Sequence, residues 1–152
     1  MNCSMSPGMR FSVISRVFRH HLDEAGRKMD MTGVQIMVMA QLHKLESTGM
    51  AEIRQRDLER ASHLSHPTMT DILKRLEKKG FIECTASPTD RRSKLVRSTP
   101  CAHAFHEEME AVDRQVFEQL TQGMSEPEKA QLISLMDIMI NNAFIANGKE
   151  VC

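Results

Sequence analysis

The segment that decides the fold is residues 64–99, which read LSHPTMTDILKRLEKKG over 64–80 and FIECTASPTDRRSKLVRST over 81–99. Ser65 is a favourable helix N-cap, and Pro67 suits the first helical turn because its missing N–H is not needed there. The apolar residues that follow recur every three or four positions: Met69, Ile72, Leu73 and Leu76. The first stretch therefore predicts an amphipathic helix over residues 66–79 that stops at Gly80.

The second stretch predicts a β-hairpin. Residues 81–85 and 94–99 have a strand-forming composition, and the polar, turn-rich residues 86–93 join them. Just upstream, Leu58 and Ala61 predict a short helix over residues 55–63. Two short helices followed directly by a hairpin are typical of a winged helix-turn-helix. The expected fold class is therefore mainly α, with a small β-hairpin wing and further helices around it.

The face of helix 66–79 opposite its apolar stripe carries hydroxyl groups, an imidazole and long cations. Such groups suit base edges and phosphates in a major groove, which is wide enough for one helix. Arginines in the hairpin loop suit a narrow minor groove, whose negative potential attracts guanidinium groups. We expect recognition-helix contacts from Ser65, His66, Thr68, Thr70, Lys74 and Arg75, and wing contacts from Asp90, Arg91, Arg92 and Lys94.

The charge distribution supports a nucleic-acid partner although the net charge of the chain is zero. Residues 54–97 carry eleven Lys and Arg against six Asp and Glu, a net charge of +5. Residues 98–152 carry three against nine, a net charge of −6, and residues 1–53 come to +1. A basic middle beside an acidic C-terminal third is typical of a DNA-facing module joined to a solvated helical arm.

The flanking segments are predicted to be helical. Periodic apolar residues and capping residues indicate helices over 11–29, from Thr32 to Gly49, over 102–123, and onward from a Ser125–Glu128 capping box. Residues 50–54 alternate apolar and polar side chains, which predicts a single edge strand. The last helix is apolar on more than one face, so we expect it to need partners on two sides.

Three stretches resemble the DNA-binding half of the multiple antibiotic resistance regulator (MarR) family: Leu64–Thr70, Leu73–Ile82 and above all Pro88–Lys94. The resemblance covers residues 54–102, and the helix order of the whole chain also fits. It implies that Asp90 holds Arg92, the arginine that enters the minor groove. The chain departs from the family at residues 98–102, Ser-Thr-Pro-Cys-Ala, where the family usually has Leu-Thr and a glycine. The join between the wing and the next helix is therefore expected to be rebuilt.

The resemblance also implies a homodimer that binds a palindromic operator in double-stranded DNA. It divides the single subunit, residues 1–152, into a winged DNA-binding region over 31–99 and a helical dimerisation region over 9–30 and 100–147. The expected dimer residues are Phe11, Ile14, Leu132, Leu135, Met136, Met139, Ile140 and Phe144. A repressor that is relieved by a small-molecule effector is the implied function, with the effector bound between the two regions.

Thirteen methionines suggest an adaptable effector pocket, because thioether side chains repack around varied partners, although ordinary core packing explains most of them. The candidate pocket residues are Met9, Phe18, Met37 and Met39.

Two alternatives within the same fold concern sensing. His103, with His106 or Glu107, stands near a helix start and could ligate zinc, and His20, His21 and His43 could complete the site across space. A reactive Cys3 or Cys101 could sense redox state, although the four cysteines have no paired spacing and read as reduced thiols. An alternative of another class is a winged-helix protein-interaction module without DNA binding, against which the retained Lys74, Asp90 and Arg92 argue.

Several classes are excluded on sequence grounds. There is no nucleophile elbow, phosphate-binding glycine loop or HExxH motif, so an enzyme is not expected, and no cofactor is implied. The longest apolar run, residues 36–40, is far shorter than the about 20 residues that a membrane span takes. The opening residues lack the pattern of a secretory signal, which predicts a cytoplasmic location.

Overall fold

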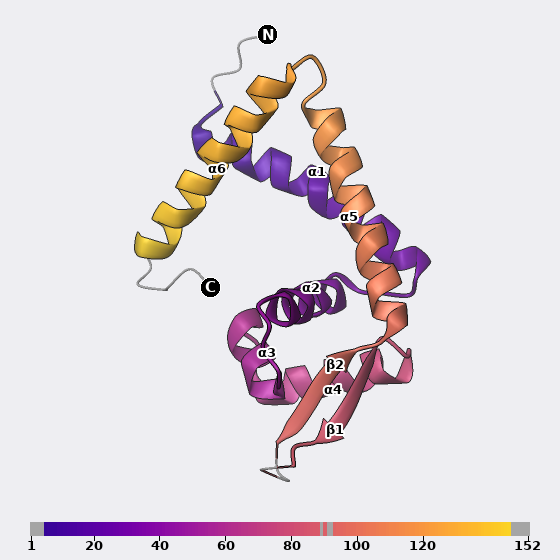
Figure 1. Ribbon diagram of the computed structural model, residues 1–152. Helices are drawn as coiled ribbons and strands as arrows, with labels where there is room; N and C mark the ends of the chain where they lie inside the picture. Colours follow the sequence, from indigo (N-terminus) through magenta and orange to yellow (C-terminus); the bar gives the residue numbers. More distant parts are fainter. Residues whose placement is uncertain (1–4, 89, 91–92, 147–152) are drawn as a thin grey trace. The chain divides into compact units, whose positions relative to one another are not determined.

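The computed structural model describes residues 5–88, 90 and 93–146, with side chains described as far as residue 143. Within these residues the chain forms six helices and one two-stranded sheet (Figure 1). The elements in chain order are α1 (Pro7–Lys28), α2 (Gly33–Ser47), α3 (Gln55–Ser62), α4 (His66–Lys78), β1 (Ile82–Ala86), β2 (Lys94–Ser98), α5 (Pro100–Leu120) and α6 (Glu126–Ala146). The chain divides into two compact units, Met1–Val116 and Phe117–Cys152.

Helix α1 begins earlier than the sequence predicts. The Ser6 side chain accepts a hydrogen bond from the Met9 N–H at 3.4 Å, and Pro7 occupies the first helical position. The periodic apolar residues start only at Phe11, so the first turn depends on this cap and was missed by periodicity alone.

Helix α2 starts with the predicted cap. The Thr32 hydroxyl accepts from the Gln35 N–H at 3.4 Å, and the Gln35 Oε1 accepts from the Thr32 N–H at 3.1 Å. This reciprocal pair satisfies two N–H groups that the start of a helix leaves without partners. After the helix the chain turns at Gly49, whose φ of 78° lies in the left-handed region that glycine adopts freely.

Helices α3 and α4 form the predicted helix-turn-helix. His63 ends α3 with a φ of 53°, and Leu64 donates to the Glu59 carbonyl at 3.1 Å, which closes the turn. The four residues predicted to form the apolar face of α4 are all buried: Met69, Ile72, Leu73 and Leu76. They pack with residues of α2, α3 and the hairpin in one core, which fixes the opposite face of α4 outward.

Strands β1 and β2 pair in antiparallel fashion, with Cys84 opposite Val96, as the predicted hairpin requires. The predicted edge strand over residues 50–54 is wrong. Only an isolated bridge between Arg54 and Leu95 forms there, supported by a hydrogen bond from the Val96 N–H to the Ile53 carbonyl at 2.8 Å. Because α3 begins at Gln55, the chain leaves the sheet before a second pair of residues can join it.

The join between β2 and α5 uses Thr99 as its organising residue. Its hydroxyl donates to the Gly80 carbonyl at 2.6 Å and accepts from the Ala102 N–H at 3.4 Å. Pro100 is the first residue of α5, a position where its missing N–H carries no cost. The Ser-Thr-Pro sequence therefore caps α5 and anchors its start to the end of α4 without a glycine.

A polar junction connects the end of α4 with the turn between α1 and α2. The Lys79 ammonium donates to the Asp30 carbonyl, lies 3.3 Å from the Asp30 carboxylate, and donates to Gln35 Oε1 at 3.3 Å. Asp30 adopts a φ of 56°, a conformation that Asp tolerates better than most residues. Lys79 therefore contacts both ends of the α1–α2 connection.

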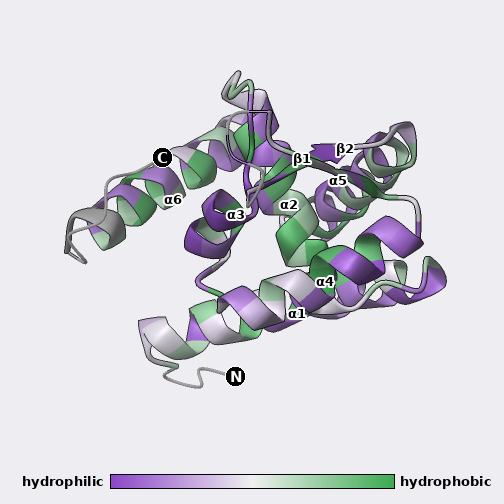
Figure 2. Cartoon of the chain, turned by 90° about the horizontal axis from the view of Figure 1, so that it is seen from below, coloured by the Kyte–Doolittle hydropathy of each residue, from purple (hydrophilic) through white to green (hydrophobic). Residues whose placement is uncertain are grey.

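The second unit contains α6, whose start follows the predicted capping residues. The Glu128 carboxylate accepts hydrogen bonds from the Ser125 N–H at 2.7 Å and from the Ser125 hydroxyl at 2.8 Å. The hydrogen bond that the glutamate contributes to a capping box is therefore formed. Hydrophobic residues recur along α6 (Figure 2), and six of them are exposed within this chain: Ile133, Leu135, Met136, Ile138, Met139 and Ile140. None of the helices in the described part of the chain is long and apolar enough to cross a membrane.

Candidate nucleic-acid interface

The exposed face of α4 carries most of the residues predicted to contact DNA. Thr68, Lys74 and Arg75 are exposed, and the side chain of His66 is 76% exposed. The basic residues Arg75 and Lys78 lie in the last turn, where the partial negative charge of the helix end favours cations. This face therefore presents hydroxyl groups at its start and cations along its length.

Three of the predicted contact residues use their hydroxyl groups in hydrogen bonds within the chain. Thr70 Oγ1 donates to the His66 carbonyl at 2.9 Å and accepts from Gln55 Nε2 at 2.8 Å. The Ser65 hydroxyl lies 2.8 Å from the Thr68 hydroxyl and makes no side-chain cap bond to the helix backbone. Thr70 therefore helps to hold the start of α4 in place. Ser65 and Thr68 form a hydrogen-bonded pair at the exposed start of that helix.

A network of side chains from α3 holds the start of α4. The buried Gln55 amide contacts Glu59 Oε1 at 2.9 Å and Thr70, and Glu59 Oε1 also lies 2.7 Å from His66 Nδ1. Sequence reasoning missed Gln55 and Glu59, because they belong to the preceding helix and their partners are seven to fifteen residues away.

The wing brings two more predicted residues beside this network. Asp90 and Lys94 are exposed, and they line a groove of about 360 Å³. The same groove is lined by Gln55, Arg56, Glu59, His66, Thr70 and Ser93. The predicted wing residues Arg91 and Arg92 lie outside the described residues. The start of α4 and the base of the wing thus share one polar surface, to which Arg56 adds a cation that the sequence did not single out.

The wing base is held by backbone hydrogen bonds. The Ser87 N–H donates to the Ser93 carbonyl, and the Ser93 N–H donates to the Asp90 carbonyl, each at 2.9 Å. Ser87 is buried, although it stands in a polar loop. These bonds fix the two ends of the loop beside α4.

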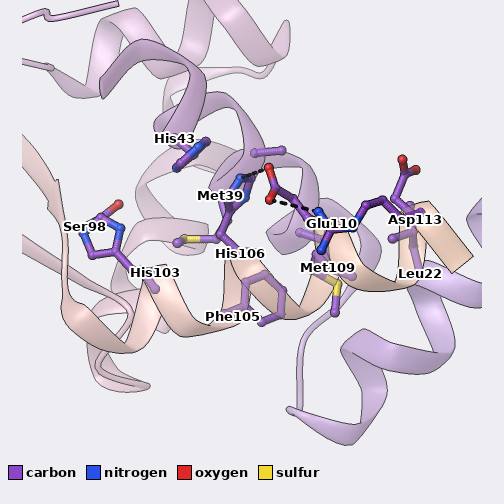
Figure 3. Close-up of a pocket in the computed structure, with 14 residues that line it drawn as sticks. Leu22, Met39, His43, Ser98, His103, Phe105, His106, Met109, Glu110 and Asp113 are labelled. Atoms are coloured by element: carbon purple, nitrogen blue, oxygen red, sulfur yellow. Dashed lines mark hydrogen bonds and ion pairs between the residues drawn. The ribbon is translucent and has the colours of Figure 1, made fainter. Parts of the chain in front are cut away.

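A second cavity, of about 380 Å³, lies where α1, α2, β2 and α5 meet (Figure 3). Its apolar wall includes Met39, Phe105 and Met109, and its polar wall is rich in imidazole and carboxylate groups. His43 from α2 stacks on His106 from α5, with ring centroids 3.5 Å apart. The Glu110 carboxylate lies 3.1 Å from His106 Nε2 and 3.7 Å from the Arg114 guanidinium.

Comparisons with known proteins agree with the fold and the winged region. Residues 31–94 match the model of the MarR family. Over these residues the chain is similar to the MarR family. That family consists of winged helix-turn-helix transcriptional regulators, which is the class of protein that the sequence predicts.

Solved structures of MarR-family proteins share the architecture of the whole chain. A crystal structure of MarR is 21% identical, with a TM-score of 0.79 and 97% of each chain covered. The Staphylococcus aureus MepR–DNA complex is 22% identical, with a TM-score of 0.68 and 91% of this chain and 98% of that one covered. The Bordetella bronchiseptica BpsR structure is 20% identical, with a TM-score of 0.65 and 93% and 97% covered. The expected MarR fold is confirmed.

The residues predicted for an effector pocket do not all line one cavity. Met39 lines the cavity between α2 and α5, whereas Met9, Phe18 and Met37 are absent from its lining. Met9 is 58% exposed on the first turns of α1. Methionine content alone pointed to side chains that lie on different surfaces.

The alternative metal residues His103 and His106 line the same cavity as His43. Among the residues that the structure describes, no three His, Cys, Asp or Glu side chains are arranged to hold a metal ion. Stacked imidazole rings present their faces to each other, which leaves their nitrogens poorly directed at a common ion.

Proposed function

We propose that this protein is a homodimeric repressor of the MarR family that binds a palindromic operator through α4 and the wing loop, residues 87–94. The observation that carries the proposal is the single polar surface formed by the start of α4 and the base of the wing. Lys74 and Arg75 extend it along the exposed face of α4. A protein that places one helix in the major groove and a hairpin in the adjacent minor groove needs these two elements side by side.

In this proposal the winged region over residues 31–99 reads DNA, and the helices over 9–30 and 100–147 pair the two subunits. The exposed apolar residues Phe11 and Ile14 of α1, and Leu135 and Met136 of α6, supply surface that a second subunit would cover. Leu132, Met139, Ile140 and Phe144 complete the proposed set on α6. Two-fold symmetry then sets two recognition helices about one helical turn of DNA apart.

The experiment measures binding of the protein to a palindrome-containing fragment from its own upstream region over a range of salt concentrations. Arg92→Ala should weaken binding strongly and lower the salt dependence by about one phosphate contact. Arg19→Ala, which removes an exposed arginine from α1, is the matched control. Unchanged affinity in the Arg92 variant would remove the wing from the mechanism, and no specific binding by the wild type would favour an interaction module.

We further propose that the cavity between α2 and α5 is the effector site. Its walls come from the winged region and from the helices proposed to pair the subunits, so a ligand there would change how the two regions meet. The BpsR structure concerns regulation of DNA binding by 6-hydroxynicotinic acid, which makes aromatic acids reasonable first probes. Met39 is the one residue retained from the predicted pocket.

Filling the cavity tests the effector proposal. Ala40→Phe should abolish release of DNA by an aromatic acid that releases the wild type, while affinity for DNA stays within about threefold. Val34→Phe, an exposed position of α2 outside the cavity lining, is the matched control. Release that persists in the Ala40 variant would place the effector elsewhere.

A further inference from the structure

We propose that Glu59 fixes the proton of the His66 imidazole on Nδ1, so that neutral His66 presents Nε2 as a hydrogen-bond acceptor and selects a base with an exocyclic amino group. The bases of that class are adenine, through N6, and cytosine, through N4. The inference rests on the proposed function, because it takes α4 as the element that reads the major groove. It adds a specificity-determining pair to that function.

The donor inventory decides which ring nitrogen carries the proton. Glu59 Oε1 lies 2.7 Å from His66 Nδ1, and an ionised carboxylate only accepts hydrogen bonds. His66 Nδ1 must therefore be the donor in this contact. A neutral imidazole with its proton on Nδ1 has a free lone pair on Nε2.

The orientation of the Gln55 amide supports the same assignment. Gln55 Nε2 has two hydrogens, and two acceptors lie at the shortest distances, Glu59 Oε1 at 2.9 Å and Thr70 Oγ1 at 2.8 Å. Both hydrogens of Gln55 Nε2 are therefore used. Gln55 Nε2 does not donate to His66 Nδ1, although the two atoms lie 3.2 Å apart, so this contact does not require an unprotonated Nδ1. Rotating the amide by 180° would instead place its oxygen against the Glu59 carboxylate, which is repulsive.

The surroundings of the pair leave Nε2 available to a ligand. The Glu59 side chain is only 19% exposed, whereas the His66 side chain is 76% exposed. His66 is the first residue of α4, and the N-terminal residues of a recognition helix are the ones that contact base edges. The inner nitrogen is therefore held by α3, and the outer nitrogen faces the solvent where DNA would lie.

Protonation of His66 would change Nε2 from a hydrogen-bond acceptor to a donor. The imidazolium carries hydrogen on both nitrogens, so Nε2 becomes a donor and matches acceptors such as guanine O6 and N7, adenine N7 or thymine O4 in place of an amino group. The charged groups that share the groove with His66 are Glu59 and Arg56 from α3, and Asp90 and Lys94 from the hairpin.

The first test observes the tautomer directly. The imidazole ¹⁵N shifts of the free protein are recorded at about pH 8, above the range in which histidines ordinarily titrate. The His66 signals are identified by their loss in His66→Ala. We expect a protonated Nδ1 and an unprotonated Nε2. A proton on Nε2 would overturn the inference without touching the proposed function.

The second test selects binding sites from a randomised duplex library with the wild type at about pH 8. The position read by His66 is the one whose preference disappears in His66→Ala. We expect adenine or cytosine there, favoured about fivefold, the discrimination of one ordinary hydrogen bond.

Glu59→Gln separates positioning from simple structural support. A glutamine can offer either its oxygen or its amino group to Nδ1, so both tautomers become accessible and the preference should fall at least threefold at that position alone. Glu83→Gln, an exposed carboxylate of β1 outside the groove lining, is the matched control. Selective binding with unchanged preference in the Glu59 variant would overturn only the inference, whereas no selective binding by the wild type would overturn the proposed function as well.

Discussion

At the scale of single residues, the two described cysteines differ in their surroundings. Cys101 is exposed, whereas burial raises the pKa of the Cys84 thiol, and the nearby Glu77 carboxylate raises this pKa further, with Lys94 opposing in part. Because the thiolate is the reactive form, Cys84 should react with iodoacetamide several-fold more slowly than Cys101 near neutral pH. Peptide mass spectrometry of timed reactions measures both rates. Equal rates would show that Cys84 is more accessible than the structure indicates.

The two threonines that flank α2 give a second prediction. Thr32→Ala removes the acceptor for the Gln35 N–H and should lower the free energy of unfolding by about 1 kcal/mol. Thr48→Ala, at the other end, removes only a hydroxyl that donates to the Leu45 carbonyl and should cost clearly less. Urea unfolding of both variants measures the difference. Equal losses would mean that the capping box does not stabilise α2 beyond an ordinary side-chain hydrogen bond.

Residue patterns predicted the buried face of α4 well and its polar chemistry poorly. Met69 and Leu76 follow from helical periodicity, which is a local property of the chain. The engagement of Thr70 does not, because its partner Gln55 lies fifteen residues away on another helix. Hydrogen bonds of that kind depend on how two helices meet, which no single-segment pattern contains.

At the scale of elements, the start of α6 should be sensitive to acid. The Ser125 backbone N–H, and then the Ser125 hydroxyl, hold the pKa of the Glu128 carboxyl below its usual range. A lowered folded-state pKa means that the stabilisation is present above the unfolded-state pKa and is lost as pH falls through the folded-state pKa. The hydrogen-exchange protection factors of the first turn of α6, which correct for the pH dependence of intrinsic exchange, should therefore fall on acidification.

Glu128→Gln provides the control for that prediction. The variant should show lower protection factors than the wild type at neutral pH and little further change in them as the pH falls. Glu107→Gln, on the exposed surface of α5, should behave like the wild type. Wild-type protection factors that do not change with pH would contradict the role assigned to the Ser125–Glu128 pair.

The elements themselves were largely predictable because their ends carry explicit signals. Thr32, Gly49 and the Ser125–Glu128 pair mark helix ends that the structure confirms. The strand predicted at residues 50–54 failed because a short alternation of apolar and polar residues does not show whether a partner strand is within reach. There, α3 begins before the pairing can extend past Arg54.

At the scale of the whole molecule, the exposed apolar residues of α6 predict self-association. Leu135 is 52% exposed and Met139 is 49% exposed within this chain. Leu135→Asp should raise the dissociation constant of the dimer at least tenfold, since burying an unpaired carboxylate at the interface costs more than the about 1.4 kcal/mol that tenfold represents. Analytical ultracentrifugation of the wild type and the variant measures this change. Gln131→Asp, at an exposed polar position of α6, is the control, and a wild type that is monomeric at micromolar concentration would contradict the prediction.

The contact of Lys79 with Asp30 and Gln35 also bears on how a signal could travel through the molecule. The end of the recognition helix is joined to the α1–α2 turn by a charged group, and its start is joined to α3 by Gln55 and Glu59. Because α4 makes these contacts at both ends, it cannot rotate on its own without breaking charge-assisted hydrogen bonds. A conformational response in this protein would therefore move helices α2 to α4 as one rigid body.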